Sequence, residues 1–149
     1  MDVCHICGFP SDASYFDQAG ILPAPAEAGQ QVVLARYTLH RNYCGVLMNF
    51  AQFTNRYARD NSQVETPGYQ WQILCNGQPR DPYLTFNFIL NPWGYGGSPV
   101  QLRLEEGCLV EFVVRNVGAT GNDVLAKVGG RLSGRYWYNT EYGGAPGRL

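Results

Sequence analysis

Apolar and polar side chains alternate most clearly between residues 99 and 116. In "VQLRL" (100–104) every second residue is aliphatic, and after "EEG" (105–107) the alternation resumes through "CLVEFVVRN" (108–116). Because successive side chains of a strand point to opposite faces, each of these segments has one apolar face. The pattern predicts two antiparallel strands joined as a hairpin, with one face of the hairpin in the core.

Further segments rich in β-branched and aromatic residues predict more strands. Asn76-Gly77 indicates a tight turn with positive φ at both central positions, and Gly129-Gly130 indicates a bulge. The charged stretch 55–68 is expected to be a short helix or a long loop. About seven or eight short strands predict an all-β protein, an antiparallel β-sandwich of jelly-roll-like or immunoglobulin-like type, with a small barrel as the alternative. The additional strand segments are 31–39, 43–54, 69–75, 83–90, 123–128 and 131–139.

The first 30 residues differ from the rest of the chain. They carry Pro23 and Pro25 among glycine, alanine and acidic residues, with no period of 2 or 3.6. Such a segment is expected to be an extended N-terminal arm. A chain of 149 residues accommodates about one domain. We therefore expect an arm over 1–30 and a single β-sandwich domain over 31–149.

Composition and charge exclude several classes of partner. Charged residues make up only 15% of the chain, so uncharged polar groups or partner proteins must cover much of the surface. The net charge of −1 leaves no basic field, and we expect no binding to nucleic acid. No apolar run is long enough to span a bilayer and residues 1–10 lack the blocks of a signal peptide, so we expect no membrane partner and synthesis in the cytoplasm.

The chain contains one C-x-x-C pair, Cys4 and Cys7, with His5 between them. Structural zinc needs four nitrogen or sulfur ligands, and a redox dithiol needs a helix N-terminus that lowers the thiol pKa. The other cysteines, at 44, 75 and 108, are in phase with apolar residues and are expected on core faces, and His40 is the remaining ligand type. We expect no cofactor. Zinc held by Cys4, His5 and Cys7, within one chain or completed by a second copy, is the alternative.

No set of residues in the sequence forms a well-supported catalytic site. There are only two histidines, and Glu105-Glu106 are neighbours in a predicted turn instead of converging on a cleft. The glycine-rich loops do not lead from a strand into a helix, as phosphate-binding loops do. We therefore expect that the protein is not an enzyme.

The aromatic residues say more about a possible binding function than the candidate catalytic residues do. Trp93 and Tyr95 lie in a Gly/Pro loop, and a second group with a neighbouring arginine lies near the end of the chain. Core and turn packing would account for them without any function. Tyrosine, tryptophan and arginine are also enriched at protein interfaces, and aromatic planes on a β-sandwich can stack on sugar rings. The second group is Arg135, Tyr136, Trp137 and Tyr138.

Four stretches together resemble small β-sandwich virion structural proteins of tailed bacteriophages. They are "LARYTLHRNYCGVLMNFAQFT" (34–54), "WQILCNGQPRDPY" (71–83), "NPWGYGGSPVQLRLEEGCLVEFVVRN" (91–116) and "VGGRLSGRYWYN" (128–139). The likeness lies in the general residue composition of the segments and in their order, not in a diagnostic motif, and it does not include the C-x-x-C. It implies a non-enzymatic accessory or connector-associated subunit, made in the host cytoplasm and present in the virion.

The leading hypothesis is accordingly a virion structural protein. It would dock on other virion proteins and on copies of itself, as head decoration, cement or a neck-associated subunit, through its arm and its aromatic C-terminal region. A carbohydrate-binding module that uses Trp93, Tyr95 and Trp137, or a fibre-anchoring adaptor, is the alternative.

Overall fold

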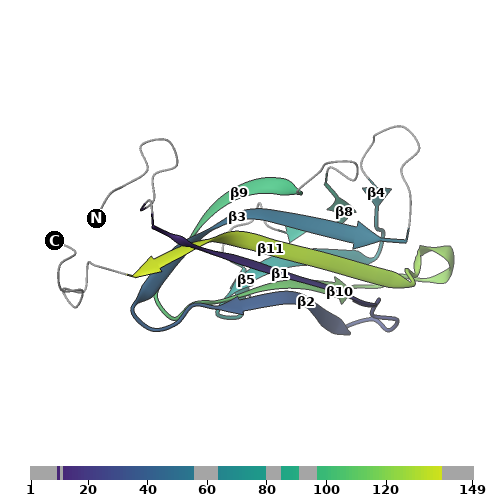
Figure 1. Ribbon diagram of the computed structural model, residues 1–149. Coiled ribbons are helices and arrows are strands. Elements are labelled where there is room, and N and C mark those ends of the chain that lie inside the picture. The colour runs from purple at the N-terminus through teal and green to yellow at the C-terminus, as the bar shows by residue number, and fades with distance from the viewer. Residues whose placement is uncertain (1–9, 11, 56–63, 80–84, 91–96, 139–149) are drawn as a thin grey trace.

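The computed structural model describes residues 10, 12–55, 64–79, 85–90 and 97–138, and within them it is an all-β sandwich, as the sequence predicts. One sheet has four strands in the order β1-β11-β3-β9, and the other has five, β2-β10-β5-β6 with β7 also on β5 (Figure 1). The four-stranded sheet consists of β1 (Ser14–Pro23), β11 (Lys127–Tyr138), β3 (Tyr43–Thr54) and β9 (Ser98–Leu104). The five-stranded sheet consists of β2 (Gln31–Thr38), β10 (Leu109–Asn116), β5 (Tyr69–Cys75), β6 (Gln78–Pro79) and β7 (Thr85–Phe86).

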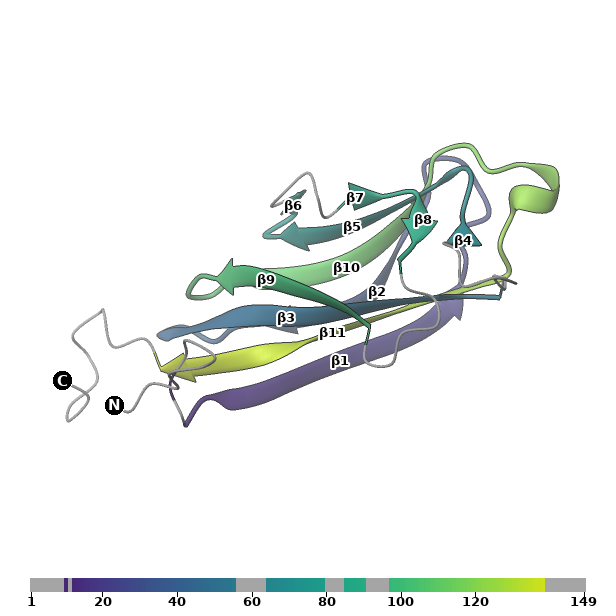
Figure 2. The same cartoon turned by 90° about the horizontal axis from the view of Figure 1, so that it is seen from above.

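The strand order is that of a jelly roll. The first strand pairs with the last, β1 with β11, and the pairs β2–β10, β3–β9 and β5–β7 follow inward along the chain, all antiparallel. Figure 2 shows β1, β11 and β3 side by side, with β9 beyond β3. Successive pairs alternate between the two sheets, which is the double Greek key of jelly rolls. Of the two sandwich types that the sequence leaves open, the structure has the jelly-roll type.

The core lies between the two sheets and is largely aromatic and aliphatic. Phe112 of β10 contacts Phe50 of the facing sheet, with ring centroids 5.8 Å apart, and Trp71 of β5 edge-on at 6.0 Å. The indole Nε1 of Trp71 donates to Thr66 Oγ1 at 3.0 Å. Leu47 and all three of these aromatic residues are at most 3% exposed. Burying a polar N–H is costly unless it is paired, so this hydrogen bond lets tryptophan occupy the core.

The Asn76-Gly77 turn is confirmed. It joins β5 to β6 with φ of 52° at Asn76 and 80° at Gly77, the left-handed conformation that this dipeptide favours in two-residue hairpins. Asn76 Oδ1 also accepts a hydrogen bond from the Leu109 backbone at 2.9 Å. The turn therefore attaches the end of β5 to the start of β10.

The predicted hairpin over 99–116 is wrong. β9 pairs with β3 in one sheet, whereas β10 pairs with β2 and β5 in the other. The connection at 105–108, closed by the Cys108 N–H donating to the Glu105 carbonyl at 3.1 Å, crosses from one sheet to the other. Alternation fixes which face of each strand is buried, but both a hairpin and a crossing between sheets satisfy it.

The expected bulge at Gly129-Gly130 is also wrong, because β11 pairs there with β1 and β3 without a shift of register. The register shift on β11 lies between Ser133 and Gly134, where β3 carries Met48 as an extra residue. Close packing explains the glycine at residue 130, because a Cβ there would lie 3.0 Å from the Leu34 side chain. In addition, β11 begins at Lys127, so only Lys127 and Val128 of the predicted strand 123–128 belong to a strand, and Asp123 ends a 3-10 helix at Gly121–Asp123.

Residues 14–23 of the predicted N-terminal arm form a strand of the sandwich. β1 is extended, as expected, and it pairs with β11 along its whole length. The Phe16 ring stacks on Tyr37 of β2 with centroids 4.4 Å apart, and a Cβ on Gly20 would clash with the Leu34 carbonyl oxygen. β1 therefore closes one side of the sandwich against β2, instead of projecting from the domain.

The segment 83–90 does not form one strand in its described part. β7 joins the five-stranded sheet, and β8 (Phe88–Ile89) pairs with β4 (Val64–Glu65) in a separate two-stranded sheet. The bend between them is at Asn87, whose carbonyl accepts from the Thr66 backbone at 3.2 Å and the Thr66 hydroxyl at 2.9 Å. Of the stretch expected to be a helix or loop, residues 56–63 lie outside the described residues.

Three cysteines are buried, as predicted, but they do not share one core. Cys75 and Cys108 belong to the cluster between the sheets. Cys44 pairs with Trp137 and alternates with Gly45, which pairs with the core residue Leu104, so Cys44 is on the opposite face of its sheet. Among the described residues no helix is long and apolar enough for a membrane span.

Candidate interaction surface

The face of the four-stranded sheet that points away from the core is the candidate functional surface. Its side chains come from alternate positions of β1, β11 and β3, which the register places in rows. One row is Ile21, Gly129 and Phe53, and the next is Ala19, Arg131 and Ala51. We call these six residues, together with Asp17, the outer-face patch. Ile21 is 63% exposed and Phe53 is 47% exposed, which is unusual for large apolar side chains on a regular sheet.

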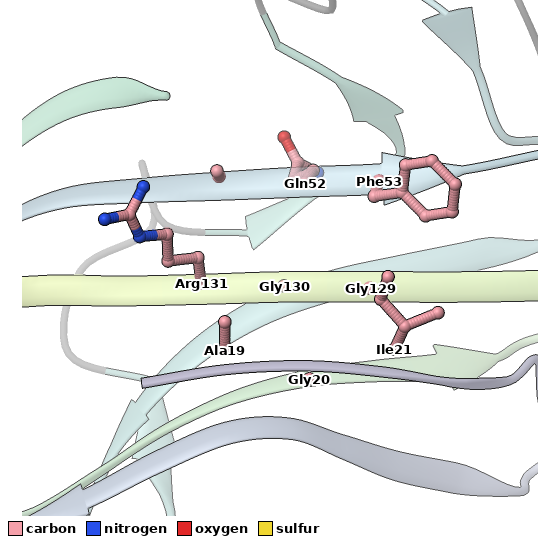
Figure 3. Close-up of a pocket in the computed structure, with 9 residues that line it drawn as sticks. Ala19, Gly20, Ile21, Gln52, Phe53, Gly129, Gly130 and Arg131 are labelled. Atoms are coloured by element: carbon pink, nitrogen blue, oxygen red, sulfur yellow. The ribbon is translucent and has the colours of Figure 1, made fainter. Parts of the chain in front are cut away.

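A shallow groove of about 350 Å³ runs through this patch. Figure 3 shows Ile21 and Phe53 on either side of β11 at Gly129. Because Gly129 has no side chain, its backbone forms the floor of the groove between them. A Cβ at Gly129 would lie 3.0 Å from Ile21 Cγ1 and 3.3 Å from Phe53 Cβ. The groove therefore exists because residue 129 is glycine, and any larger residue would fill it.

One ion pair borders the groove. Arg131 donates from Nε to Asp17 Oδ1 at 2.7 Å and from its terminal nitrogen to Oδ2 at 2.5 Å. This two-bond geometry suits a guanidinium and a carboxylate. The hydrogen bond from Arg131 holds the pKa of Asp17 below its usual value, and the same bond raises the pKa of Arg131. Both groups therefore stay charged near neutral pH, and their two charges offset each other.

The predicted contact residues at 135–138 divide between the two faces of the sheet. Arg135 and Trp137 pair with Val46 and Cys44 on the outer side. The guanidinium of Arg135 lies 5.2 Å from the centre of the exposed Tyr15 ring, a cation–π arrangement. All of the residues at 135–138 are only partly buried.

Tyr136 and Tyr138 belong instead to a tyrosine cluster at the end of the sandwich. The ring of Tyr136 lies 5.9 Å from those of Tyr37 and Tyr43, and that of Tyr138 lies 5.5 Å from Tyr43. Burial, with smaller contributions from the charge of Tyr136 and the hydrogen bond to it, raises the pKa of Tyr37 to about 12. These rings pack against one another at this end of the sandwich, and like Arg135 and Trp137 they stay partly exposed.

The raised pKa predicts a loss of stability at high pH. Tyr37 titrates at about 10 in the unfolded chain and at about 12 in the folded protein. Its contribution is therefore complete below about pH 10 and is lost as the pH rises through 12. Urea unfolding between pH 9 and 12 should show this decline, and Tyr37→Phe should make it shallower. An equal slope in both proteins would contradict the assignment.

Several predicted site residues lie outside the described residues. These are Trp93 and Tyr95 of the proposed sugar platform, and Cys4, His5 and Cys7 of the alternative zinc site. His40 is exposed, with its ring edge-on to Tyr43 at 6.5 Å. Within the ranges that the structure describes, no three His, Cys, Asp or Glu side chains are grouped as metal ligands.

The sequence prediction missed the outer-face patch. Ile21 lies in the segment that the sequence predicts to be an arm, and the sequence predicts a bulge at Gly129. Exposure of Phe53 follows from the phase of β3, and the extra residue Met48 changes that phase within the strand. Comparisons of the chain with protein-family models, with curated proteins and with solved structures give no match.

Proposed function

We propose that this protein is a non-enzymatic structural subunit of a bacteriophage virion, which docks on neighbouring capsid or connector subunits as a decoration, cement or neck-associated protein. The observation that carries the proposal is the exposed apolar patch on the regular outer face of a jelly-roll sheet. Contiguous exposed apolar surface is typical of protein contact sites. The order of the sequence segments that resemble phage virion proteins supports the same class.

The fold supports this proposal without specifying it. Jelly rolls occur in viral capsid proteins, lectins and cupins, so the architecture alone does not select a function. The patch distinguishes among these classes because its groove is apolar, and its single charged lining residue, Arg131, is already paired with Asp17. A sugar site needs polar groups that are available for hydroxyls, whereas a protein contact needs a neutral apolar centre.

The experiment is to find the particle that carries the native protein. Lysate from the producing cells is separated on a density gradient, and peptides of the chain are quantified by mass spectrometry in each fraction. We expect the protein to migrate with nuclease-resistant, nucleic-acid-containing particles of megadalton mass, far from the 16.6 kDa of one chain. Recovery only at low mass would contradict the proposal, and low-mass protein that binds a glycan array would support the carbohydrate-binding alternative.

A further inference from the structure

We propose that the outer-face patch binds an acidic peptide segment of a partner protein, in which one aliphatic side chain lies between two carboxylates. The aliphatic side chain packs on Ile21 and Phe53, and the carboxylates pair with Lys127 and Arg131. The inference rests on the proposed function and deepens it, because it states the chemistry of the neighbouring subunit. The arrangement of the side chains, the charge of the face and its size each support it.

The groove at Gly129 has apolar side chains in one direction and cations in the other. Across the sheet, Ile21 and Phe53 flank Gly129 (Figure 3). Along β11, Lys127 and Arg131 are the outward-pointing residues on either side of Gly129. Successive outward positions of a strand are about 6.6 Å apart, so these two residues are separated by about 13 Å. An extended peptide has the same spacing, so acidic, aliphatic and acidic residues at alternate positions match this arrangement.

The apolar contact is made with the exposed parts of Ile21 and Phe53, not with the floor of the groove. The space beside Gly129 is narrow, since even a Cβ there would lie 3.0 Å from Ile21 Cγ1 and 3.1 Å from the Gly20 carbonyl oxygen. A partner side chain therefore rests across Ile21 and Phe53, which are 63% and 47% exposed. An aliphatic side chain of moderate size is enough to cover them.

The charge of the face determines the sign of the partner. Strands β1, β3 and β11 hold three cationic side chains, Lys127, Arg131 and Arg135, and one carboxylate, Asp17, all at outward positions. Three positive charges less one negative charge leave an excess of two, on a chain whose net charge is −1. Asp17 is held by Arg131 through two of the five N–H donors of the guanidinium. The face therefore repels a basic partner and attracts an acidic one.

The same side chains favour a peptide over a nucleic acid. Binding to a nucleic acid depends mainly on several cations that neutralise successive phosphates. Here the centre of the patch is apolar, and the carboxylate of Asp17 lies beside Arg131. A peptide can place an aliphatic side chain on the apolar centre and its carboxylates at the two ends.

The size of the face fits a short segment better than a globular surface. Four strands spaced about 4.8 Å apart, with about ten residues of about 3.3 Å each, present a face of roughly 600 Å². Stable interfaces between globular proteins bury about 800 Å² on each partner. A segment that follows β11 from Lys127 to Arg131 needs only a strip in the middle of this face.

The test is a titration of the isotope-labelled full-length protein with a synthetic peptide, followed by NMR chemical shifts. The peptide is blocked at both ends and contains glutamate, serine, valine, serine and glutamate in that order. The matched peptide has glutamine in place of both glutamates. We expect shifts at residues 19–21, 51–53 and 127–131, and at least about tenfold weaker binding of the glutamine peptide, because it makes no charge-assisted contacts.

A charge-reversal variant locates the contact on the face. Lys127→Glu should weaken binding of the glutamate peptide at least about tenfold, because it replaces attraction with repulsion. Arg115→Glu is the matched control, since it makes the same change of charge at an exposed position of β10, in the other sheet. Its binding should be unchanged. Lys127 is also the only lysine of the chain, so a carbodiimide should join the peptide to the unmodified protein at this side chain.

Several results would overturn the proposal. They are the absence of shifts up to about 1 mM peptide, equal binding of the two peptides, and an equal loss of binding in Arg115→Glu. A short single-stranded DNA that shifts the same residues at lower concentration would assign the face to nucleic acid instead. The unmodified protein with the two peptides is sufficient, so the outcome does not depend on whether a variant folds. No virion particle takes part, so failure here is distinct from failure of the gradient experiment.

Discussion

Replacing Phe112 with alanine is expected to lower the free energy of unfolding by about 3–5 kcal/mol, the usual cost of removing a large buried aromatic ring. Phe112 is fully buried where the two sheets meet, since its ring contacts Phe50 of the facing sheet as well as Trp71 of its own sheet. The cavity cannot collapse easily, because the hydrogen bond to Thr66 fixes the Trp71 indole. The cost depends on how far the neighbours relax, so a constrained site favours the upper part of the range.

Chemical denaturation followed by circular dichroism measures this loss. Val117→Ala is the matched control, since Val117 follows β10 directly but is 56% exposed. We expect the control to change stability by no more than about 0.5 kcal/mol. A loss below about 1 kcal/mol for Phe112→Ala would mean that the two sheets do not pack through this residue.

The local pattern of the sequence predicts burial well but does not predict pairing. Val110, Phe112 and Val114 are all buried, as their alternation with Glu111 and Arg115 indicates. Alternation is a property of one strand, and one buried face is enough to produce it. The partners of β10 are β2 and β5, which lie far away in the chain. The order of the strands depends on these distant contacts, and for that reason the predicted hairpin failed.

Glycine is ambiguous in the same way. Within a strand it marks either a bulge or a close approach of other atoms, and the sequence does not distinguish the two. Gly129 and Gly130 are in regular pairing, with the groove on one side and Leu34 on the other. The irregular position where β3 pairs with β11 is Met48, which has no sequence feature typical of a bulge.

For the aromatic residues at the end of β11, the alternation of side chains along a strand allows a more detailed prediction than the one made from composition. Tyr136 and Trp137 are neighbours in sequence, so a strand must place them on opposite faces. The pattern alone could therefore have divided the predicted contact surface into an outer part with Arg135 and an inner part with Tyr138. It could not have located the groove, because the groove depends on β1 lying beside β11.

Gly134→Ala is expected to be strongly destabilising, with a loss of about 3 kcal/mol or more in the free energy of unfolding. A Cβ at Gly134 would clash with the Val46 carbonyl oxygen and would lie 2.8 Å from the Phe16 ring. Overpacking usually costs about 1–3 kcal/mol. Here the blocking atom belongs to the backbone of β3, so relief requires the separation of β3 from β11, and the cost should reach or exceed the top of that range.

Gly129→Ala in the same strand is the control, because its Cβ would lie 3.0 Å from Ile21 Cγ1, 3.1 Å from the Gly20 carbonyl oxygen and 3.3 Å from Phe53 Cβ, which are tight contacts but not the backbone clash found at Gly134. We expect it to cost less than about 1 kcal/mol in denaturant unfolding. Equal losses for the two variants would contradict the argument, since they would show a general penalty for replacing glycine in β11. A large difference would establish that Gly134 is required by the close packing of β11 on β3, and that Gly129 is free to shape the groove.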